Sequence, residues 1–203
     1  MGAYFIQGLL LGFTAAASPG PLQAYFLSQT MQVGWRRTLP SSLAPLISDA
    51  PIILLVLFVL TRTPDSVLRI IRIGGGFFLL YLAASSLISY RRRRPDASAP
   101  SQPMHTSILK AALTNILNPN PYIFWGIVAG PILLSAWRQS ATFGASFLVG
   151  FYGTLVGGFL LLITIFAAGR RFVPRLNSSL SLLAILALTV FGIFQLYSGL
   201  TGN

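Results

Sequence analysis

One acidic residue lies inside the long apolar runs of this chain. Asp49 falls near the middle of a segment that extends from Thr38 to Leu60. A carboxylate at the centre of a bilayer costs about 3 kcal/mol on insertion scales, so it should face other protein segments and need a proton or a partner. Asp49 is therefore a candidate ion-binding residue. The alternative is a structural carboxylate that is hydrogen-bonded to a neighbouring hydroxyl or amide.

Other polar residues accompany Asp49 at helical spacing. Ser41, Ser42, Pro45 and Ser48 fall on the same side of the predicted helix. This stripe predicts one face of an internal cavity.

Two proline motifs in the chain have the same spacing. Ser18-Pro19-Gly20-Pro21 lies within a charge-free run from Met1 to Trp35, which as one straight helix would measure about 50 Å. A bilayer core is only about 30 Å thick, so the run should be interrupted. Asn118-Pro119-Asn120-Pro121 repeats the pattern, and each motif is followed by an apolar run and a Trp-Arg pair. The chain therefore reads as two related halves.

These motifs predict broken helices that share a site. Ser18 and Asn118 are expected as N-caps, with Pro19 and Pro119 as the first helical residues. The N–H groups of Gly20 and Asn120 would then face an anionic group such as a carboxylate. The alternative is that the prolines only kink two helices for packing. The candidate substrate- and ion-binding residues are Ser18, Pro19, Gly20, Pro21, Asp49, Asn118, Pro119, Asn120 and Pro121.

The composition is that of an integral membrane protein. Hydrophobic residues make up 54% of the 203 residues and charged residues only 8%. The net charge of +11 comes from basic residues between the apolar runs, which indicates topology signals and lipid contacts and no nucleic acid partner. No cysteine is present, so disulfides and thiolate metal sites are excluded. We expect no metal site and no cofactor.

Six spans fit the apolar pattern of one membrane domain, 1–203. A first three-helix repeat covers 1–90, a cytoplasmic linker rich in arginine, serine and proline covers 91–106, and a second repeat covers 107–203. Glycines in the fifth span predict close helix packing, within the bundle or in a homo-oligomer. The expected spans are Tyr4 to Gln32, Thr38 to Leu60, Ile73 to Tyr90, Ile108 to Ser135, Ala141 to Ala168 and Leu176 to Leu200.

The basic residues predict the orientation of these spans. Ten fall in one set of alternate loops and four in the other, so the first set should be cytoplasmic and both termini should lie outside. Three spans per half place the second half upside down relative to the first, as an inverted repeat. The ten are Arg36, Arg37, Arg91, Arg92, Arg93, Arg94, Lys110, Arg170, Arg171 and Arg175, and the four are Arg62, Arg69, Arg72 and Arg138.

The chain resembles the LysE/RhtB family of amino-acid exporters over nearly its whole length. The resemblance is carried by Pro19-Gly20-Pro21, Asp49, Gly76 with Tyr81-Leu82, and Asn118-Pro119. It implies a six-helix protein of the inner membrane that exports amino acids or small derivatives, driven by the membrane potential or the proton gradient.

The chain departs from the family pattern at two places. Many members have a lysine where this chain has Asn120, and alignment of the two Trp-Arg pairs places Phe151 opposite Asp49. The second half therefore offers no matching charge, which leaves the substrate and the coupling open.

The leading hypothesis is a secondary exporter coupled to protons, with a substrate carboxylate at the helix breaks and an ammonium group or a proton at Asp49. A cation or metal exporter and a structural membrane subunit without transport activity are the alternatives. We expect no enzyme, because the spans show no nucleophile with a base, no metal cluster and no paired cysteines.

Overall fold

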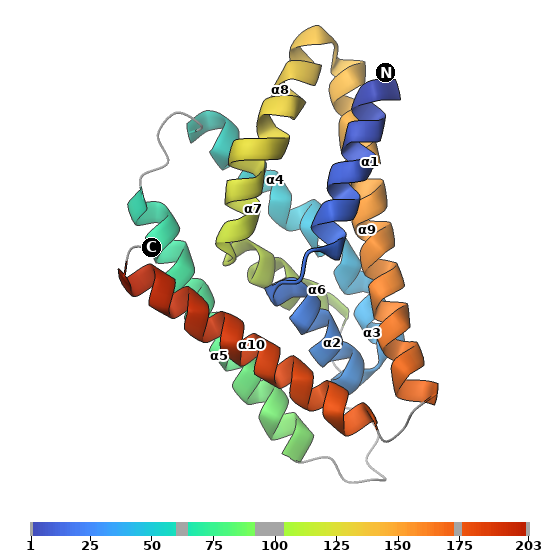
Figure 1. Ribbon diagram of the computed structural model, residues 1–203, viewed down its shortest axis with the longest axis vertical. Helices are drawn as coiled ribbons and strands as arrows, with labels where there is room; N and C mark the ends of the chain where they lie inside the picture. The colour runs from blue at the N-terminus through green and yellow to red at the C-terminus, as the bar shows by residue number, and fades with distance from the viewer. Residues whose placement is uncertain (1, 60–64, 92–103, 173–175, 202–203) are drawn as a thin grey trace.

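The computed structural model describes residues 2–59, 65–91, 104–172 and 176–201, and this part of the chain consists of helices and short connections without a strand (Figure 1). The expected all-α class is confirmed. In chain order the segments are α1 (Gly2–Ala17), α2 (Pro21–Val33), α3 (Trp35–Thr38), η1 (Leu39–Leu43), α4 (Ala44–Val59), α5 (Asp65–Arg91), α6 (Met104–Ile116), α7 (Pro119–Phe124), η2 (Trp125–Ala129), α8 (Gly130–Gln139), α9 (Ala141–Phe172) and α10 (Leu176–Thr201).

Both proline motifs interrupt a helix, as predicted. α1 ends at Ala17 and α2 begins at Pro21, whereas α6 ends at Ile116 and α7 begins at Pro119. Proline lacks an N–H group and is tolerated in the first turn of a helix, where no intrahelical acceptor is needed. Each motif therefore ends one helix and begins the next.

The N-cap prediction is correct at the second break and wrong at the first. Asn118 has extended backbone and its side chain accepts a hydrogen bond from the N–H of Asn120. At the first break the N-cap is Gly20, and Pro21 is the first helical residue. The Ser18 hydroxyl donates instead to the carbonyl of Thr14 at 2.7 Å, so Ser18 completes the preceding helix.

Side chains satisfy carbonyl groups that the breaks release. The Tyr122 hydroxyl donates to the carbonyl of Ile116 at 2.9 Å, and the Gln195 amide donates to that of Leu117 at 3.2 Å. At the first break the Gln23 amide donates to the carbonyl of Ala16 at 3.3 Å. Irregular backbone at membrane depth is tolerated only where such partners exist. These bonds therefore stabilise both interruptions.

Two further irregularities lie in segments that the sequence suggested were regular. η1 is a 3-10 helix, whereas η2 is a π-helix that lies directly before α8. Pro131 lies in the first turn of α8 and cannot donate to the carbonyl of Ile127, and the wider π turn lies where that bond is missing. The second and fourth predicted spans are therefore composite helices.

Three stretches within the described residues are long and apolar enough to cross a membrane as single helices. They are Trp35–Val56, Ala141–Gly169 and Ser181–Thr201, and two shorter apolar helices cover Gly2–Ala17 and Ile73–Ile88. The breaks divide the first and fourth predicted spans into shorter pieces. The prediction of six spans therefore rests on joining these pieces.

The most extensive helix contacts connect the two halves of the chain. These are the contacts of α1 along α9 and of α5 along α10 (Figure 1). A smaller contact places α4 on α6. In each half, the piece that precedes the break thus lies on the second span of the other half. This exchange fits the predicted inverted repeat, which remains a prediction.

Glycine residues allow α1 to approach α9 closely. A Cβ atom on Gly8 would lie 2.2 Å from the carbonyl oxygen of Phe147, and one on Gly12 would lie 2.2 Å from that of Phe151. The Thr154 hydroxyl donates across the same contact to the carbonyl of Leu9 at 3.0 Å. Small residues at this spacing bring two backbones together, as is common between membrane helices.

Parts of the predicted topology lie outside the described residues. These are most of the arginine-rich linker, residues 92–103, and the basic residues Arg62 and Arg175. The orientation of the chain in the membrane therefore remains a prediction.

Candidate functional site

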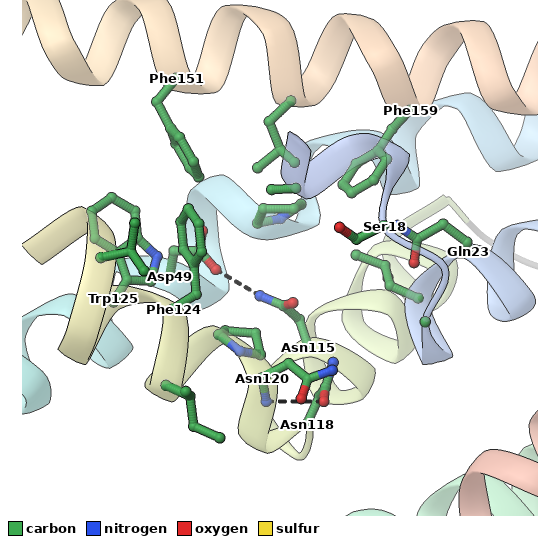
Figure 2. A pocket seen from close by; sticks show the side chains of 18 of the residues that line it. Ser18, Gln23, Asp49, Asn115, Asn118, Asn120, Phe124, Trp125, Phe151 and Phe159 are labelled. Carbon is green, nitrogen blue, oxygen red and sulfur yellow. Dashed lines mark hydrogen bonds between the residues drawn. The ribbon is translucent and has the colours of Figure 1, made fainter. Parts of the chain in front are cut away.

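A cavity of about 440 Å³ lies between the two helix breaks (Figure 2). Its wall includes α1 and α2 on one side and the α6–α7 break on the other, with α4 and α9 between them. The lining residues are Ala15, Ser18, Pro19, Gly20, Leu22, Gln23, Pro45, Asp49, Asn115, Asn118, Asn120, Pro121, Ile123, Phe124, Trp125, Ile127, Val128, Phe151, Leu155 and Phe159.

Seven of the nine predicted site residues line this cavity. Pro21 and Pro119 do not line it, because each is buried at the first position of its helix. The seven are Ser18, Pro19, Gly20, Asp49, Asn118, Asn120 and Pro121. Two motifs a hundred residues apart thus meet at one cavity, with Asp49 beside them. Their role in binding stays a prediction.

Asp49 is buried, with 4% of its surface exposed, and its partners are neutral. The Asn115 amide donates to Oδ1 at 2.6 Å and the Tyr152 hydroxyl donates to Oδ2 at 3.3 Å. Trp125 supplies a further side-chain contact to the carboxylate (Figure 2). Asn115 is itself oriented by a second bond, from the same amide nitrogen to the Ser48 hydroxyl at 2.8 Å. The carboxylate is thus held in position but not neutralised by a basic side chain.

These partners of Asp49 were not among the predicted site residues. Asn115 is the one amide in the apolar run before the second break, and it precedes Asn118 by about one helical turn. Tyr152 follows Phe151, the residue that the sequence alignment of the two halves places opposite Asp49. These two sequence relationships could have identified Asn115 and Tyr152 as candidate partners of Asp49.

The polar stripe predicted beside Asp49 is only partly correct. Pro45 and Asp49 line the cavity, whereas Ser41, Ser42 and Ser48 do not. The 3-10 geometry of η1 changes the helical phase of the first two serines. All three hydroxyls bond to protein groups: Ser41 pairs with Ser107, Ser42 donates to Leu39, and Ser48 donates to Ala44.

The N–H groups at the second break are not free for an anion. Pro119 and Pro121 have none, and the N–H of Asn120 donates to the Asn118 side chain at 3.1 Å. The prediction that Asn120 presents a free N–H is therefore wrong. The capping bond that begins α7 uses the donor that an anion would need.

Aromatic rings form much of the cavity surface. We use the term aromatic wall for Phe124, Trp125, Phe151 and Phe159 (Figure 2). Phe124 and Phe151 stack with centroids 5.7 Å apart, and Trp125 meets Phe151 edge to face at 5.1 Å. Trp125 and Phe151 are each only 1% exposed, so packing fixes their rings. The cavity is therefore more apolar than the sequence suggested.

The cavity and its surroundings offer few ligands for a metal ion. Within the described residues, no group of three or more His, Cys, Asp or Glu side chains is close enough together to hold one. Among the lining residues, Asp49 is the one whose side chain carries a carboxylate or an imidazole group. One carboxylate with amide and aromatic neighbours is a poor site for a transition metal.

Comparison with known proteins gives one clear match. Neither the curated proteins nor the solved structures gave a match to this chain. The family model described as LysE type translocator matches residues 13–199, a range that includes both helix breaks, Asp49 and every residue that lines the cavity. The chain therefore belongs to the LysE type translocator family.

Proposed function

We propose that this protein is a secondary active transporter that exports an amino acid or a small amino-acid derivative across the cytoplasmic membrane, coupled to the proton gradient. The observation that carries the proposal is the cavity where two broken helices meet a buried carboxylate. Membership of a translocator family supports a membrane exporter of amino acids or related compounds. Broken helices that meet at a central cavity are a common way to build a transporter site.

Asp49 is the proposed coupling residue. A buried carboxylate is costly unless a proton or a cation neutralises it, and its partners here are the neutral side chains of Asn115, Trp125 and Tyr152. A proton and a substrate ammonium group would therefore compete for this carboxylate. Such competition makes the two exchange across the membrane, as antiport requires.

The helix breaks supply the neutral part of the proposed site. Ser18, Gly20, Asn118 and Asn120 present polar atoms to the cavity, and Pro19 and Pro121 shape its wall. Pro21 and Pro119 contribute indirectly, because they fix where α2 and α7 begin. We further propose the inner membrane as the location, with both termini outside.

Transport into sealed vesicles would test this proposal. Purified protein in liposomes with an imposed pH gradient should accumulate labelled amino acids or their derivatives, and collapse of the gradient with an uncoupler should abolish the accumulation. Asp49→Asn keeps the shape of the side chain but removes its charge, so gradient-driven accumulation should fall at least about tenfold. Phe194→Ala, at an exposed position on α10, is the matched control and should transport normally.

Two outcomes would contradict parts of the proposal. If Asp49→Asn accumulated substrate like the parent, with the same dependence on the gradient, the carboxylate would be structural. If no amino acid or derivative were moved by the parent protein, the transport function itself would be wrong.

A further inference from the structure

The charge in the cavity is of one sign, negative. Among all lining residues Asp49 is the one that carries a charge, and the other polar side chains are neutral hydroxyls and amides. These neutral groups are Ser18, Gln23, Asn115, Asn118 and Asn120. An ammonium group in the cavity therefore meets a full negative charge, whereas a free carboxylate meets no basic side chain and is repelled by Asp49.

The helix breaks supply no positively charged side chain for a carboxylate, and the second break has no free N–H group at the start of its helix. Pro119 and Pro121 remove two N–H donors from the start of α7, and the Asn118 side chain occupies the donor between them. At the first break Pro19 and Pro21 remove two more, so the donors that remain there are the backbone N–H groups of Gly20 and of the first turn of α2. An anion binds well to a helix N-terminus only where several free N–H groups converge. The cavity thus offers a full negative charge to a cation, whereas a carboxylate meets only uncharged backbone donors at one of the two breaks.

The aromatic wall adjoins the charged end of the cavity. Trp125 contacts the Asp49 carboxylate and also meets Phe151 edge to face at 5.1 Å. Phe159 lies further along α9, where it packs edge to face on Phe26 at 5.1 Å. Aliphatic residues of the α7–η2 segment extend this surface, namely Ile123, Ile127 and Val128. One ligand can therefore place an amine at Asp49 and an apolar body on the wall.

From these three observations we infer that the cavity selects a monocation with a primary amine on a bulky apolar body, whose carboxyl group is absent or masked as an amide or ester. Free zwitterionic amino acids are the weaker ligands. The ligand class is proposed as the cargo, so in this respect the inference rests on the proposed transport function. Burial of the apolar body supplies affinity, and Asp49 supplies selection for the charge.

A fluorescence titration would test the ligand class without transport. Trp35 and Trp137 are 40% and 50% exposed, whereas Trp125 is buried in the cavity wall. Trp35→Phe combined with Trp137→Phe leaves Trp125 as the one tryptophan reporter. The purified protein would be titrated at about pH 6.5, where a primary α-amine is charged. The probes are phenylalaninamide, phenylalanine, 3-phenylpropionate and glycinamide.

Phenylalaninamide should bind at least about tenfold more tightly than phenylalanine, because only the free amino acid brings a carboxylate near Asp49. It should also bind at least about tenfold more tightly than glycinamide, which lacks the apolar body. 3-Phenylpropionate should show no saturable binding. Equal or tighter binding of phenylalanine would overturn the charge argument, and equal binding of glycinamide would overturn the role of the aromatic wall.

Variants assign each preference to its residue. Phe159→Ala should weaken phenylalaninamide binding but not glycinamide binding, and Phe194→Ala, at an exposed position outside the cavity lining, should change neither. Asn120 is exposed at the cavity, so Asn120→Lys can supply the missing cation and should reduce the gap between phenylalaninamide and phenylalanine. Asn120→Gln is its neutral control and should keep the gap. An unchanged gap in Asn120→Lys would contradict the inference.

Transport in vesicles separates this inference from the proposed function. Export of free leucine or lysine without export of phenylalaninamide or leucinamide would refute the ligand class and keep the transporter. Failure to move any of these compounds would refute the transporter, whereas the titration would still decide what the cavity binds.

Discussion

The two helix breaks share a motif but are held in different ways. At the first break, Gly20 is the N-cap without a side-chain bond, and α1 is positioned by glycine contacts with α9. At the second break, Asn118 caps α7 and Asn115 binds Asp49. Alignment of the motifs places Ala15 at the position of Asn115, and Ala15 also lines the cavity. The first half thus contributes close packing, and the second contributes the polar contacts of the site.

The largest loss of stability is expected from the glycine packing between α1 and α9 at the first break. Gly12→Leu places a side chain where even a Cβ atom would lie 2.2 Å from the Phe151 carbonyl oxygen, so α1 and α9 must separate. Overpacking of this kind costs about 3 kcal/mol, enough to lower the yield of folded protein strongly. Thermal unfolding in detergent, followed by size-exclusion chromatography, would measure the loss.

Gly153→Leu is the matched control for this substitution. Gly153 lies on α9 and is exposed, and a Cβ atom there would have no neighbour within 4 Å. Its melting temperature should stay close to that of the parent. Equal melting temperatures for both leucine variants would show that glycine packing does not hold the first break.

A smaller loss of stability is expected at the second break, where the polar contacts of the site lie. Asn115→Ala removes the donor to Asp49 and leaves a buried carboxylate with one fewer hydrogen bond, which should cost about 1–3 kcal/mol. Ala15 is the equivalent position in the other half. For Ala15→Ser the change in the free energy of unfolding should stay within about 0.5 kcal/mol, because no buried group loses a partner. Thermal unfolding of both variants would check the difference. Similar losses at the two positions would remove the asymmetry between the halves.

The smallest predicted difference concerns the caps. Asn118→Ala removes a true N-cap bond and should cost about 1 kcal/mol. Ser18→Ala removes a hydroxyl that bonds within α1 and caps nothing, so its cost should be a few tenths of a kcal/mol. Thermal unfolding of Asn118→Ala and Ser18→Ala would measure this difference. A larger loss for Ser18→Ala would mean that the serine supports the first break after all.

The sequence predicted the breaks and Asp49 because proline and a buried charge act locally. Pro21 and Pro119 fit best at the start of a helix, where no N–H donor is needed, and the cost of a charge in the membrane favours an Asp49 that faces protein. The caps were harder, because a serine can bond to the preceding turn as easily as it can cap the next helix. Ser18 does the former.

The partners of Asp49 depend on packing between distant segments. Asn115 and Tyr152 reach the carboxylate only because α6 and α9 pack near α4 across the halves of the chain. The aromatic wall has the same origin, since Phe124 and Phe151 come from different helices and look like ordinary apolar residues in sequence. The six-span inverted repeat remains a prediction.

The exchange of contacts between the halves determines which parts can move as rigid bodies. α1 is bound to α9, and α5 is bound to α10, so each of these pairs contains one helix from each half (Figure 1). A rotation of residues 1–90 against residues 107–203 would have to break the contacts within both helix pairs. A hinge that keeps the pairs intact would separate α1 and α9 from α5 and α10. We therefore expect any moving units to combine helices from both halves of the chain, and a crosslink between α1 and α9 should leave such a motion free.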